Sequence, residues 1–337
     1  MSKRLRVGFC GAGSIVKSNH LPALEARGDR YEVAGFFDVA ADKARELAGG
    51  KYRAYATYAE MLADKAVDVV VIATKPLATH YPAARQALEA GKHVVLEKPM
   101  ASTSSECDEL IALARRMRLA LTIHHNRRLD LDFLALQDII RQKKIGDPQL
   151  IENCVGNGNY GGGDFVDWGV HLVDQSLLLN KSPLREVSAV FCNPAGGIGD
   201  CGYGASLFRF TAPPLVILAM MPRPREFLLN GLPAATRFYA AGTTGAYTQR
   251  TIEDPRDLMN ATQNFDKALP EYAVPSYLNI HRREYYDFLY ESLAAGVPLL
   301  VKPEEARNAI RVLELMEESA KANKAVSATN MLEIKEV

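Results

Sequence analysis

The N-terminal third of the chain contains short apolar runs that alternate with longer amphipathic stretches. A run such as Val67–Ala73 is apolar at nearly every position, which is typical of a strand buried on both faces of a parallel sheet. The pattern predicts strands at Leu5–Cys10, Tyr31–Asp38, Val67–Ala73, His93–Glu97 and Ala120–His124. It predicts helices at Ser14–Arg27 (kinked at Pro22), Ala41–Ala48, Tyr58–Ala63, His80–Ala90 and Ser104–Arg118. This alternation indicates an α/β domain with a parallel sheet.

The pattern changes near residue 125. After a helix at Asp130–Lys143, most apolar stretches have the length of strands, and clusters of Gly, Pro and Asn separate them. The expected strands are Gln149–Val155, Glu186–Phe191, Ala205–Phe210, Leu215–Met221 and Thr236–Ala240; the expected helices are Asp164–Leu179, Asn279–Ala295 and Pro303–Asn323. Few helices interrupt these strands, which favours a mainly antiparallel sheet. We therefore expect two domains, residues 1–124 and residues 125–337, in line with a length that exceeds one ordinary core.

Charge and cysteine content narrow the class of protein. The 40 basic and 40 acidic residues cancel, so no bulk charge favours nucleic acid or an anionic membrane as a partner. The five cysteines form no CxxC pair, and although Cys192 and Cys201 could pair across a hairpin, the sparse set favours reduced thiols and a cytoplasmic location. The N-terminal residues lead directly into a strand, and no apolar run reaches the ~20 residues of a membrane span, so neither signal peptide nor membrane anchor is expected.

A glycine-rich turn follows the first strand. Gly11 and Gly13 form a G-x-G-x-x pattern with Ser14, Ile15 and Val16, between a strand and a helix. The first glycine permits a tight turn, and the second lets the backbone approach a pyrophosphate at the helix N-terminus. Val16 stands where Gly or Ala is usual, and its bulk should move the helix slightly away from the sheet. The pattern indicates a Rossmann dinucleotide site; the alternative is a structural βα turn.

Asp38 supports the dinucleotide interpretation. It ends the second predicted strand, where a carboxylate accepts hydrogen bonds from the adenosine ribose hydroxyls and repels a 2′-phosphate. No arginine follows it directly, although Lys43 could reach the region. We therefore expect NAD as the cofactor, with NADP as the less favoured alternative. A purely structural Asp38 would be a helix N-cap.

Several motifs together resemble the Gfo/Idh/MocA oxidoreductases, named after glucose-fructose oxidoreductase and inositol dehydrogenase. The resemblance covers nearly the whole chain. It rests on Gly11-Ala12-Gly13, His20–Leu24, Thr74–His80, Ala87–Val94, Glu97-Lys98-Pro99, and Gly161-Gly162-Gly163 followed by Asp167, His171 and Asp174. It implies a Rossmann domain followed by an α/β domain whose open, mainly antiparallel sheet mediates dimer or tetramer formation.

The resemblance also implies further cofactor contacts. It places Glu97 and Lys98 beside the nicotinamide, together with Thr74, Lys75, Pro76 and His80. The Thr74–His80 segment is one residue longer than the family's usual T-P-x-x-x-H.

A Lys, an Asp and a His can supply the proton chemistry of alcohol oxidation. Lys98 ends a strand at the carboxyl edge of the sheet, where its ammonium can stabilise an alkoxide. Asp167 and His171 lie one helical turn apart, and an imidazole with a pKa near ~6.5 suits proton abstraction at neutral pH. The alternatives are a surface lysine, a structural helix, and an Asp-x-x-x-His metal site. No CxxC or HExxH motif completes such a site, so no metal is expected.

Other side chains near these motifs are candidates for substrate contact. Asn157, Asn159, Tyr160 and Trp168 flank the second glycine run and could hydrogen-bond or stack on a polyol; Trp168 could equally be a packing residue. Arg127 and Arg128 follow a strand end and could touch substrate or form an ion pair that joins the domains.

These inferences predict a cytoplasmic NAD-dependent oxidoreductase that acts on a secondary alcohol of a sugar, sugar acid, inositol or related polyol. Lys98 and His171 would form the proton relay, supported by Asp167. Two alternatives remain: a redox-neutral NAD-dependent glycosidase or epimerase, and a non-catalytic nucleotide-sensing regulator. The apolar stretches Leu215–Met221 and Val187–Phe191 should contribute to an open sheet face, which predicts a homodimer or homotetramer.

Overall fold

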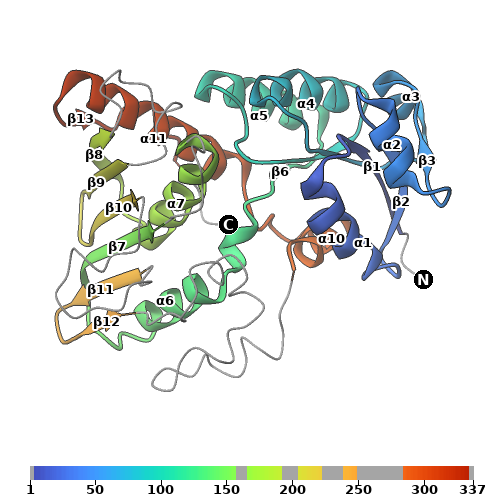
Figure 1. The fold of residues 1–337 in the computed structure, drawn as a ribbon. Coiled ribbons are helices and arrows are strands. Elements are labelled where there is room, and N and C mark those ends of the chain that lie inside the picture. The colour runs from blue at the N-terminus through green and yellow to red at the C-terminus, as the bar shows by residue number, and fades with distance from the viewer. Residues whose placement is uncertain (1–3, 157–164, 192–203, 222–237, 249–283, 334–337) are drawn as a thin grey trace. The chain divides into compact units, whose positions relative to one another are not determined.

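The computed structural model describes residues 4–156, 165–191, 204–221, 238–248 and 284–333, and the statements below concern these residues (Figure 1). The chain divides into two compact units. Unit 1 comprises Met1–His125, Arg283–Ile310 and Leu332–Val337. Unit 2 comprises Asn126–Arg282 and Arg311–Met331.

Unit 1 contains a six-stranded sheet in which every pair of neighbouring strands is parallel. Its strands are β1 (Leu5–Cys10), β2 (Tyr31–Phe37), β3 (Arg53–Ala54), β4 (Val69–Ile72), β5 (His93–Leu96) and β6 (Leu121–Ile123). Their order is β3-β2-β1-β4-β5-β6, so the direction of strand addition reverses between β1 and β4. Val69–Ile72 is fully buried, as expected for a continuously apolar strand that is covered on both faces of a parallel sheet. The predicted Rossmann sheet is confirmed.

The helices between these strands match the sequence pattern closely, apart from the first. They are η1 (Val16–His20), α1 (Leu21–Glu25), α2 (Ala41–Ala48), α3 (Tyr58–Ala63), η2 (Leu77–Thr79), α4 (His80–Glu89) and α5 (Ser104–Met117). The single kinked helix expected over Ser14–Arg27 instead changes type, because η1 is a π-helical turn in which the Leu21 amide donates to the Val16 carbonyl. Pro22 has no N–H to donate, and α1 begins just before it.

A C-terminal segment belongs to unit 1. It contains α10 (Tyr285–Ala295) and the first part of α11 (Pro303–Ala322). Asp287 on α10 accepts two hydrogen bonds of 2.8 Å from Arg27 and one of 3.0 Å from Arg30. The Tyr31 hydroxyl also donates to the carbonyl of Tyr286 at 2.7 Å. The sequence had assigned this segment to a domain of residues 125–337; these long-range polar contacts place it with the first sheet instead.

Unit 2 is built on a seven-stranded sheet of order β12-β11-β7-β10-β9-β8-β13. The strands are β7 (Pro148–Gly156), β8 (Leu184–Phe191), β9 (Gly204–Phe210), β10 (Leu215–Met221), β11 (Phe238–Gly242), β12 (Ala246–Thr248) and β13 (Val326–Ser327). β7 and β10 pair in parallel, and the other neighbours are antiparallel. The expected mainly antiparallel sheet is therefore confirmed.

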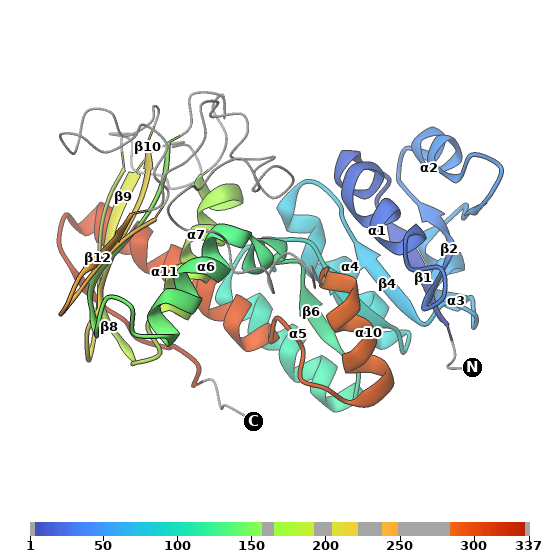
Figure 2. The same ribbon diagram turned by 90° about the horizontal axis from the view of Figure 1, so that it is seen from below.

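The two faces of this second sheet differ. Figure 2 shows α6 (Leu131–Arg141) and α7 (Phe165–Leu179) on one side of it. Side chains that point to the helices, such as Val216 and Phe208, are fully buried. On the alternate positions, Leu207 and Ile217 are paired neighbours that remain partly exposed, and Val190 is 69% exposed. None of the helices in the described ranges is long and apolar enough to cross a membrane.

The Asp287 cluster should make a measurable contribution to the stability of unit 1. Burial by itself raises the pKa of Asp287, but hydrogen bonds from Arg27 and the Glu284 amide, with the arginine charges, lower it below the usual value. A depressed folded pKa means that the contribution is present above about pH 4 and is lost as the pH falls through the folded pKa. We expect Asp287→Asn to reduce the free energy of unfolding at pH 7 by about 1–3 kcal/mol. The difference in the free energy of unfolding between the variant and the unaltered protein should decrease below about pH 4.

Chemical denaturation at several pH values measures this effect. Asp29→Asn is the matched control, since Asp29 is 79% exposed and lies 3.7 Å from Arg30. That control should change stability little, because exposed ion pairs contribute little. Equal losses in the two variants would contradict the assignment.

Candidate functional site

The two glycines of the first turn are required for different reasons. Gly11 directly follows β1 with a φ of +106°, and a Cβ at this position would lie 2.3 Å from the carbonyl oxygen of Ala73. Only glycine fits there. Gly13, in contrast, has no positive φ, and a Cβ added to it would meet no atom within 4 Å. The packing of the described residues does not require glycine at position 13, which leaves room for a ligand to approach the backbone.

The helix that follows begins at this turn. The carbonyl of Gly13 accepts hydrogen bonds from the amides of Val16 (3.1 Å) and Lys17 (3.2 Å). Val16 is fully buried, so the third position of the motif serves packing. Ser14 is exposed and Ile15 is 38% exposed, which puts both at the surface beside the turn.

Asp38 is bonded directly to the glycine-rich turn. Its Oδ2 accepts a hydrogen bond of 2.8 Å from the Ala12 amide, and its Oδ1 accepts one of 2.9 Å from the Ala40 amide. It is not the N-cap of α2, because that cap is Ala40 without a side-chain bond. Each carboxylate oxygen keeps a second lone pair that can accept from a hydroxyl. The half-buried carboxylate therefore lies where a ribose diol beside the turn could reach it.

These features fit a bound dinucleotide. The turn lies at the carboxyl end of β1, at the point where the strand order reverses, and open α/β sheets bind ligands there. Gly13 leaves open space, and Asp38 supplies an acceptor beside the turn. The residues present thus provide the space and the polar acceptor that such a ligand needs.

Two further segments follow β4 and β5 at the same edge of the sheet. The imidazole of His80 joins them, with Nδ1 2.8 Å from the Pro99 carbonyl oxygen and Nε2 3.0 Å from the Thr74 carbonyl oxygen. His80 is buried, whereas Lys75 and Pro76 are exposed. The Lys75–Pro76 and Lys98–Pro99 peptide bonds are both cis. His80 thereby fixes the Thr74 segment against the turn that carries Lys98.

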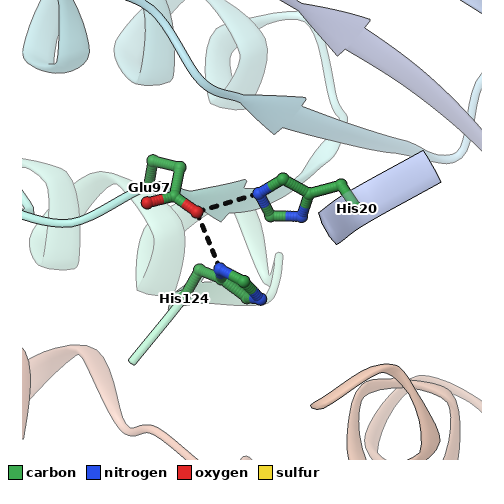
Figure 3. Close-up of side chains that lie close together, drawn as sticks. All are labelled: His20, Glu97 and His124. Atoms are coloured by element: carbon green, nitrogen blue, oxygen red, sulfur yellow. Dashed lines mark hydrogen bonds and ion pairs between the residues drawn. The ribbon is translucent and has the colours of Figure 1, made fainter. Parts of the chain in front are cut away.

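Glu97 is buried, and its carboxylate points toward His20 and His124, as Figure 3 shows. Its Oε1 lies 2.8 Å from Nε2 of His20 and 2.7 Å from Nδ1 of His124. The sequence placed Glu97 at the cofactor, and this role stays a prediction. What the sequence missed is the partnership with the two histidines, which come from distant elements and carry no local signal.

The directions of the pKa shifts describe the charge of this cluster. Burial by itself raises the pKa of Glu97, but attraction to His124 and hydrogen bonds from both imidazoles outweigh it, so the pKa lies well below its usual value. Burial lowers the pKa of His20, with His124 adding to the effect. We therefore assign an ionised Glu97 and a neutral His20 that donates from Nε2.

The predicted Asp and His of unit 2 lie on α7. Asp167 is partly exposed, and His171 is only 5% exposed one turn later. The rings of Trp168 and His171 are 5.9 Å apart between centroids, and the guanidinium of Arg127 lies 4.4 Å above the Trp168 ring. The contact of Arg127 with Trp168 was not foreseen, since nothing in the sequence pairs them.

Arg128 and Asp174 form a buried ion pair. Nε and Nη2 of Arg128 donate to the two carboxylate oxygens of Asp174 at 2.8 and 2.6 Å. Both residues belong to unit 2, so the ion pair gives Arg128 a structural role within that unit. Arg127 is paired with Asp130 at 3.1 Å in the same unit. The remaining predicted residues Asn157, Asn159, Tyr160 and Gly161-Gly162-Gly163 lie outside the described residues.

A separate hollow does not coincide with these residues. It has a volume of about 610 Å³ and lies between α3 and α4, beside Leu62, Gln86 and Lys92. Lys92 directly precedes β5, so the hollow is at the amino edge of the sheet. Because ligands of open α/β sheets bind at the carboxyl edge, we assign it no part in the site.

Comparison with known proteins adds to this picture. A family model described as an oxidoreductase family with an NAD-binding Rossmann fold matches residues 5–125. The uncharacterised oxidoreductase YdgJ of Escherichia coli is 34% identical, over 76% of this chain and 74% of its own length. The scyllo-inositol 2-dehydrogenase (NADP⁺) IolW of Bacillus subtilis is 24% identical, over 96% and 95%. The structure of an NAD-binding protein from Listeria innocua is similar with a TM-score of 0.77 and 29% identity, over 96% and 97%.

The different roles of the two glycines give a test of the dinucleotide site. We expect Gly13→Ala to leave the melting temperature nearly unchanged, because its Cβ meets no protein atom, while dinucleotide affinity falls at least ~10-fold. Gly11→Ala should instead destabilise the fold by roughly 1–3 kcal/mol through its positive φ. Thermal melts and calorimetric titration of the dinucleotide measure both effects. Undiminished affinity in Gly13→Ala would rule out close approach of the cofactor at this position.

Proposed function

The chain belongs to the Gfo/Idh/MocA oxidoreductase family, and we propose that it transfers hydride between NAD and a secondary alcohol of a sugar, inositol or related polyol. The observation that carries the proposal is the placement of Lys98. Its turn follows β5, and His80 ties the next residue, Pro99, to the Thr74 segment after β4. The backbone that carries Lys98 is thereby held at the sheet edge where the glycine turn also lies.

Each residue has a chemical role in this proposal. The nicotinamide, when bound, accepts the hydride. The Lys98 ammonium holds the substrate oxygen and stabilises the negative charge that develops on it. His171 removes the hydroxyl proton, and Asp167 orients His171 or binds a neighbouring hydroxyl. Trp168, whose ring is contacted by the Arg127 guanidinium, presents an aromatic face to a sugar ring. Asn157 and Tyr160 are proposed to complete the polar contacts with the substrate.

The substrate class is inferred from the polar residues and from a relative. IolW is named as an inositol dehydrogenase, which supports a polyol for this chain without defining it. A redox-neutral glycosidase or epimerase would use the same residues but release no NADH. We also propose a cytoplasmic location, on the basis of the five cysteines that form no CxxC pair.

A substrate screen tests the proton relay. Sugars, polyols and their keto forms are supplied with each cofactor, and the absorbance of reduced nicotinamide is followed. On the active substrate, Lys98→Ala and His171→Ala should each lower turnover ~10²-fold or more, while NAD affinity changes little. Lys51→Ala is the control, since Lys51 is 66% exposed and paired with Glu25. Near-normal turnover in His171→Ala would show that His171 is not the base, and turnover without NADH would indicate the redox-neutral alternative.

Asp38 should determine the choice of cofactor. Since its carboxylate is fixed beside the glycine turn, it should favour a free ribose diol and repel a 2′-phosphate. The name of IolW specifies NADP⁺, so our preference for NAD rests on Asp38. Calorimetry should show tighter binding of NAD than of NADP, and Asp38→Ala should remove this difference. Equal or tighter NADP binding by the unaltered protein would contradict the proposal.

We propose a homodimer or homotetramer that forms through the second sheet. Leu207 and Ile217 are paired neighbours on the face opposite the one that bears α6 and α7, and both are partly exposed. Light scattering at micromolar concentration should give a mass above the 37.0 kDa of one chain. Leu207→Glu with Ile217→Glu should shift the mass toward the monomer, whereas Val297→Glu, at a site 45% exposed in unit 1, should not. A single-chain mass for the unaltered protein would refute the assembly.

A further inference from the structure

We propose that Glu97 is a positioning residue that fixes the backbone of Lys98 relative to the helix after the glycine turn. The inference rests on the proposed function, because it assumes that Lys98 is used in hydride transfer. It concerns side chains of unit 1 alone, and it assigns a role to a buried group that the proton relay does not use.

The carboxylate of Glu97 connects elements that are far apart in the sequence. His20 ends η1, the helical turn that begins three residues after Gly13, and His124 directly follows β6. Both imidazoles contact Oε1 of Glu97, at 2.8 and 2.7 Å (Figure 3). Nδ1 of His20 lies 2.6 Å from the hydroxyl of Tyr286 on α10. The Glu97 carboxylate thus joins the ends of β5 and β6 to η1. His20 extends the hydrogen bonds from there to α10.

The donors and acceptors of this cluster form one consistent set. The Tyr286 hydroxyl donates to His20 Nδ1, and His20 Nε2 donates to Glu97. Burial raises the pKa of the Tyr286 hydroxyl well above its usual value, which keeps its proton available for donation. Glu97, His20, His124 and Tyr286 are all buried residues, each at most 6% exposed, so water does not compete for these bonds. A buried anion with several donors keeps its position, because leaving any donor unpaired is costly.

The other oxygen of Glu97 reaches the catalytic turn. Oε2 accepts a hydrogen bond of 3.1 Å from the backbone amide of Lys98. On the other flank, Pro99 has its carbonyl held by His80 at 2.8 Å. Lys98 is therefore fixed on both sides, and a shift of about 1 Å at a catalytic group can cost ~10²-fold in rate. This connection gives Glu97 an effect on catalysis without contact with the reacting atoms.

The geometry favours hydrogen bonds over a metal ion at this cluster. A zinc ion bonded to two ligands at its usual lengths would hold their atoms about 3.3 Å apart. The observed separations of 2.7 and 2.8 Å are those of direct hydrogen bonds.

Glu97→Gln tests the inference, since it keeps the shape and removes the charge. Glu106→Gln is the matched control, because Glu106 also accepts hydrogen bonds from backbone amides, those of Ser102 and Thr103, away from this cluster. Amide hydrogen exchange at Lys98 is measured on the full-length protein without cofactor. On the substrate found by the screen, kcat, KM and the dissociation constant of NAD are measured as well. Tyr286→Phe, which removes one hydroxyl at the far end of the cluster, gives a milder perturbation that keeps the ring.

The expected result separates positioning from general destabilisation. In Glu97→Gln, exchange at Lys98 should be at least ~10-fold faster and kcat should fall ~10-fold or more, with KM and NAD affinity within about threefold. Tyr286→Phe should change both quantities in the same direction by less, and Glu106→Gln should change neither. Unchanged exchange at Lys98 would overturn the inference, as would a loss of kcat matched by equal losses in NAD affinity. One equivalent of tightly bound metal in the purified protein would also overturn it.

The two proposals fail differently. If the unaltered protein transfers no hydride to any compound in the screen, the proposed function fails, while exchange at Lys98 still decides the positioning. If the unaltered protein is active and Glu97→Gln retains its kcat, the positioning role fails and the proposed function stands.

Discussion

The arrangement of the cofactor side of this enzyme depends on one buried carboxylate. Glu97 is only 6% exposed, and its two oxygens accept hydrogen bonds from His20, His124 and the amide of Lys98. Removing a carboxylate from water is expensive unless donors replace the lost hydration. Those donors come from the helix after the glycine turn and from two neighbouring strand ends. Because the buried charge of Glu97 needs all of these donors, it fixes η1 and the ends of β5 and β6 relative to one another.

At the carboxyl edge of the first sheet, three residues, Gly11, Gly13 and Asp38, shape the proposed cofactor site. Gly11 solves a problem internal to the fold, since any side chain there would collide with the strand end of β4. At Gly13, in contrast, a side chain would collide with none of the described residues. The open space beside Gly13 is therefore the more direct indication of a ligand. Asp38 both stabilises the turn through the Ala12 amide and keeps acceptor capacity for a hydroxyl. The same carboxylate thus has a structural role and is proposed to bind the cofactor.

Unit 2 uses its polar residues in a different way. Its buried ion pair between Arg128 and Asp174 links the turn after residue 125 to α7, and it leaves Asp167, Trp168 and His171 one turn or less apart at the start of that helix. A bidentate pair is suited to this purpose, because its planar geometry fixes orientation as well as distance. The sequence motif Asp-x-x-x-His-x-x-Asp therefore contains two kinds of acidic residue. Asp174 is structural, whereas Asp167 remains partly exposed.

The sequence by itself determined the elements whose signals are local. Strands such as Leu5–Cys10, helices such as Ala41–Ala48, the glycine turn with Asp38, and the helical spacing of Asp167 and His171 all follow from short-range patterns. The two- and three-residue strands β3, β12 and β13 escaped notice, because so few residues carry no periodicity.

Only the tertiary structure decided the long-range partnerships. Tyr286 and Asp287 bind residues more than 250 positions earlier. Glu97 accepts hydrogen bonds from His20 and His124, which lie on two distant elements. A buried polar group forms hydrogen bonds with the groups that the fold places beside it, and those partners can be distant in the sequence. No local sequence pattern predicts them.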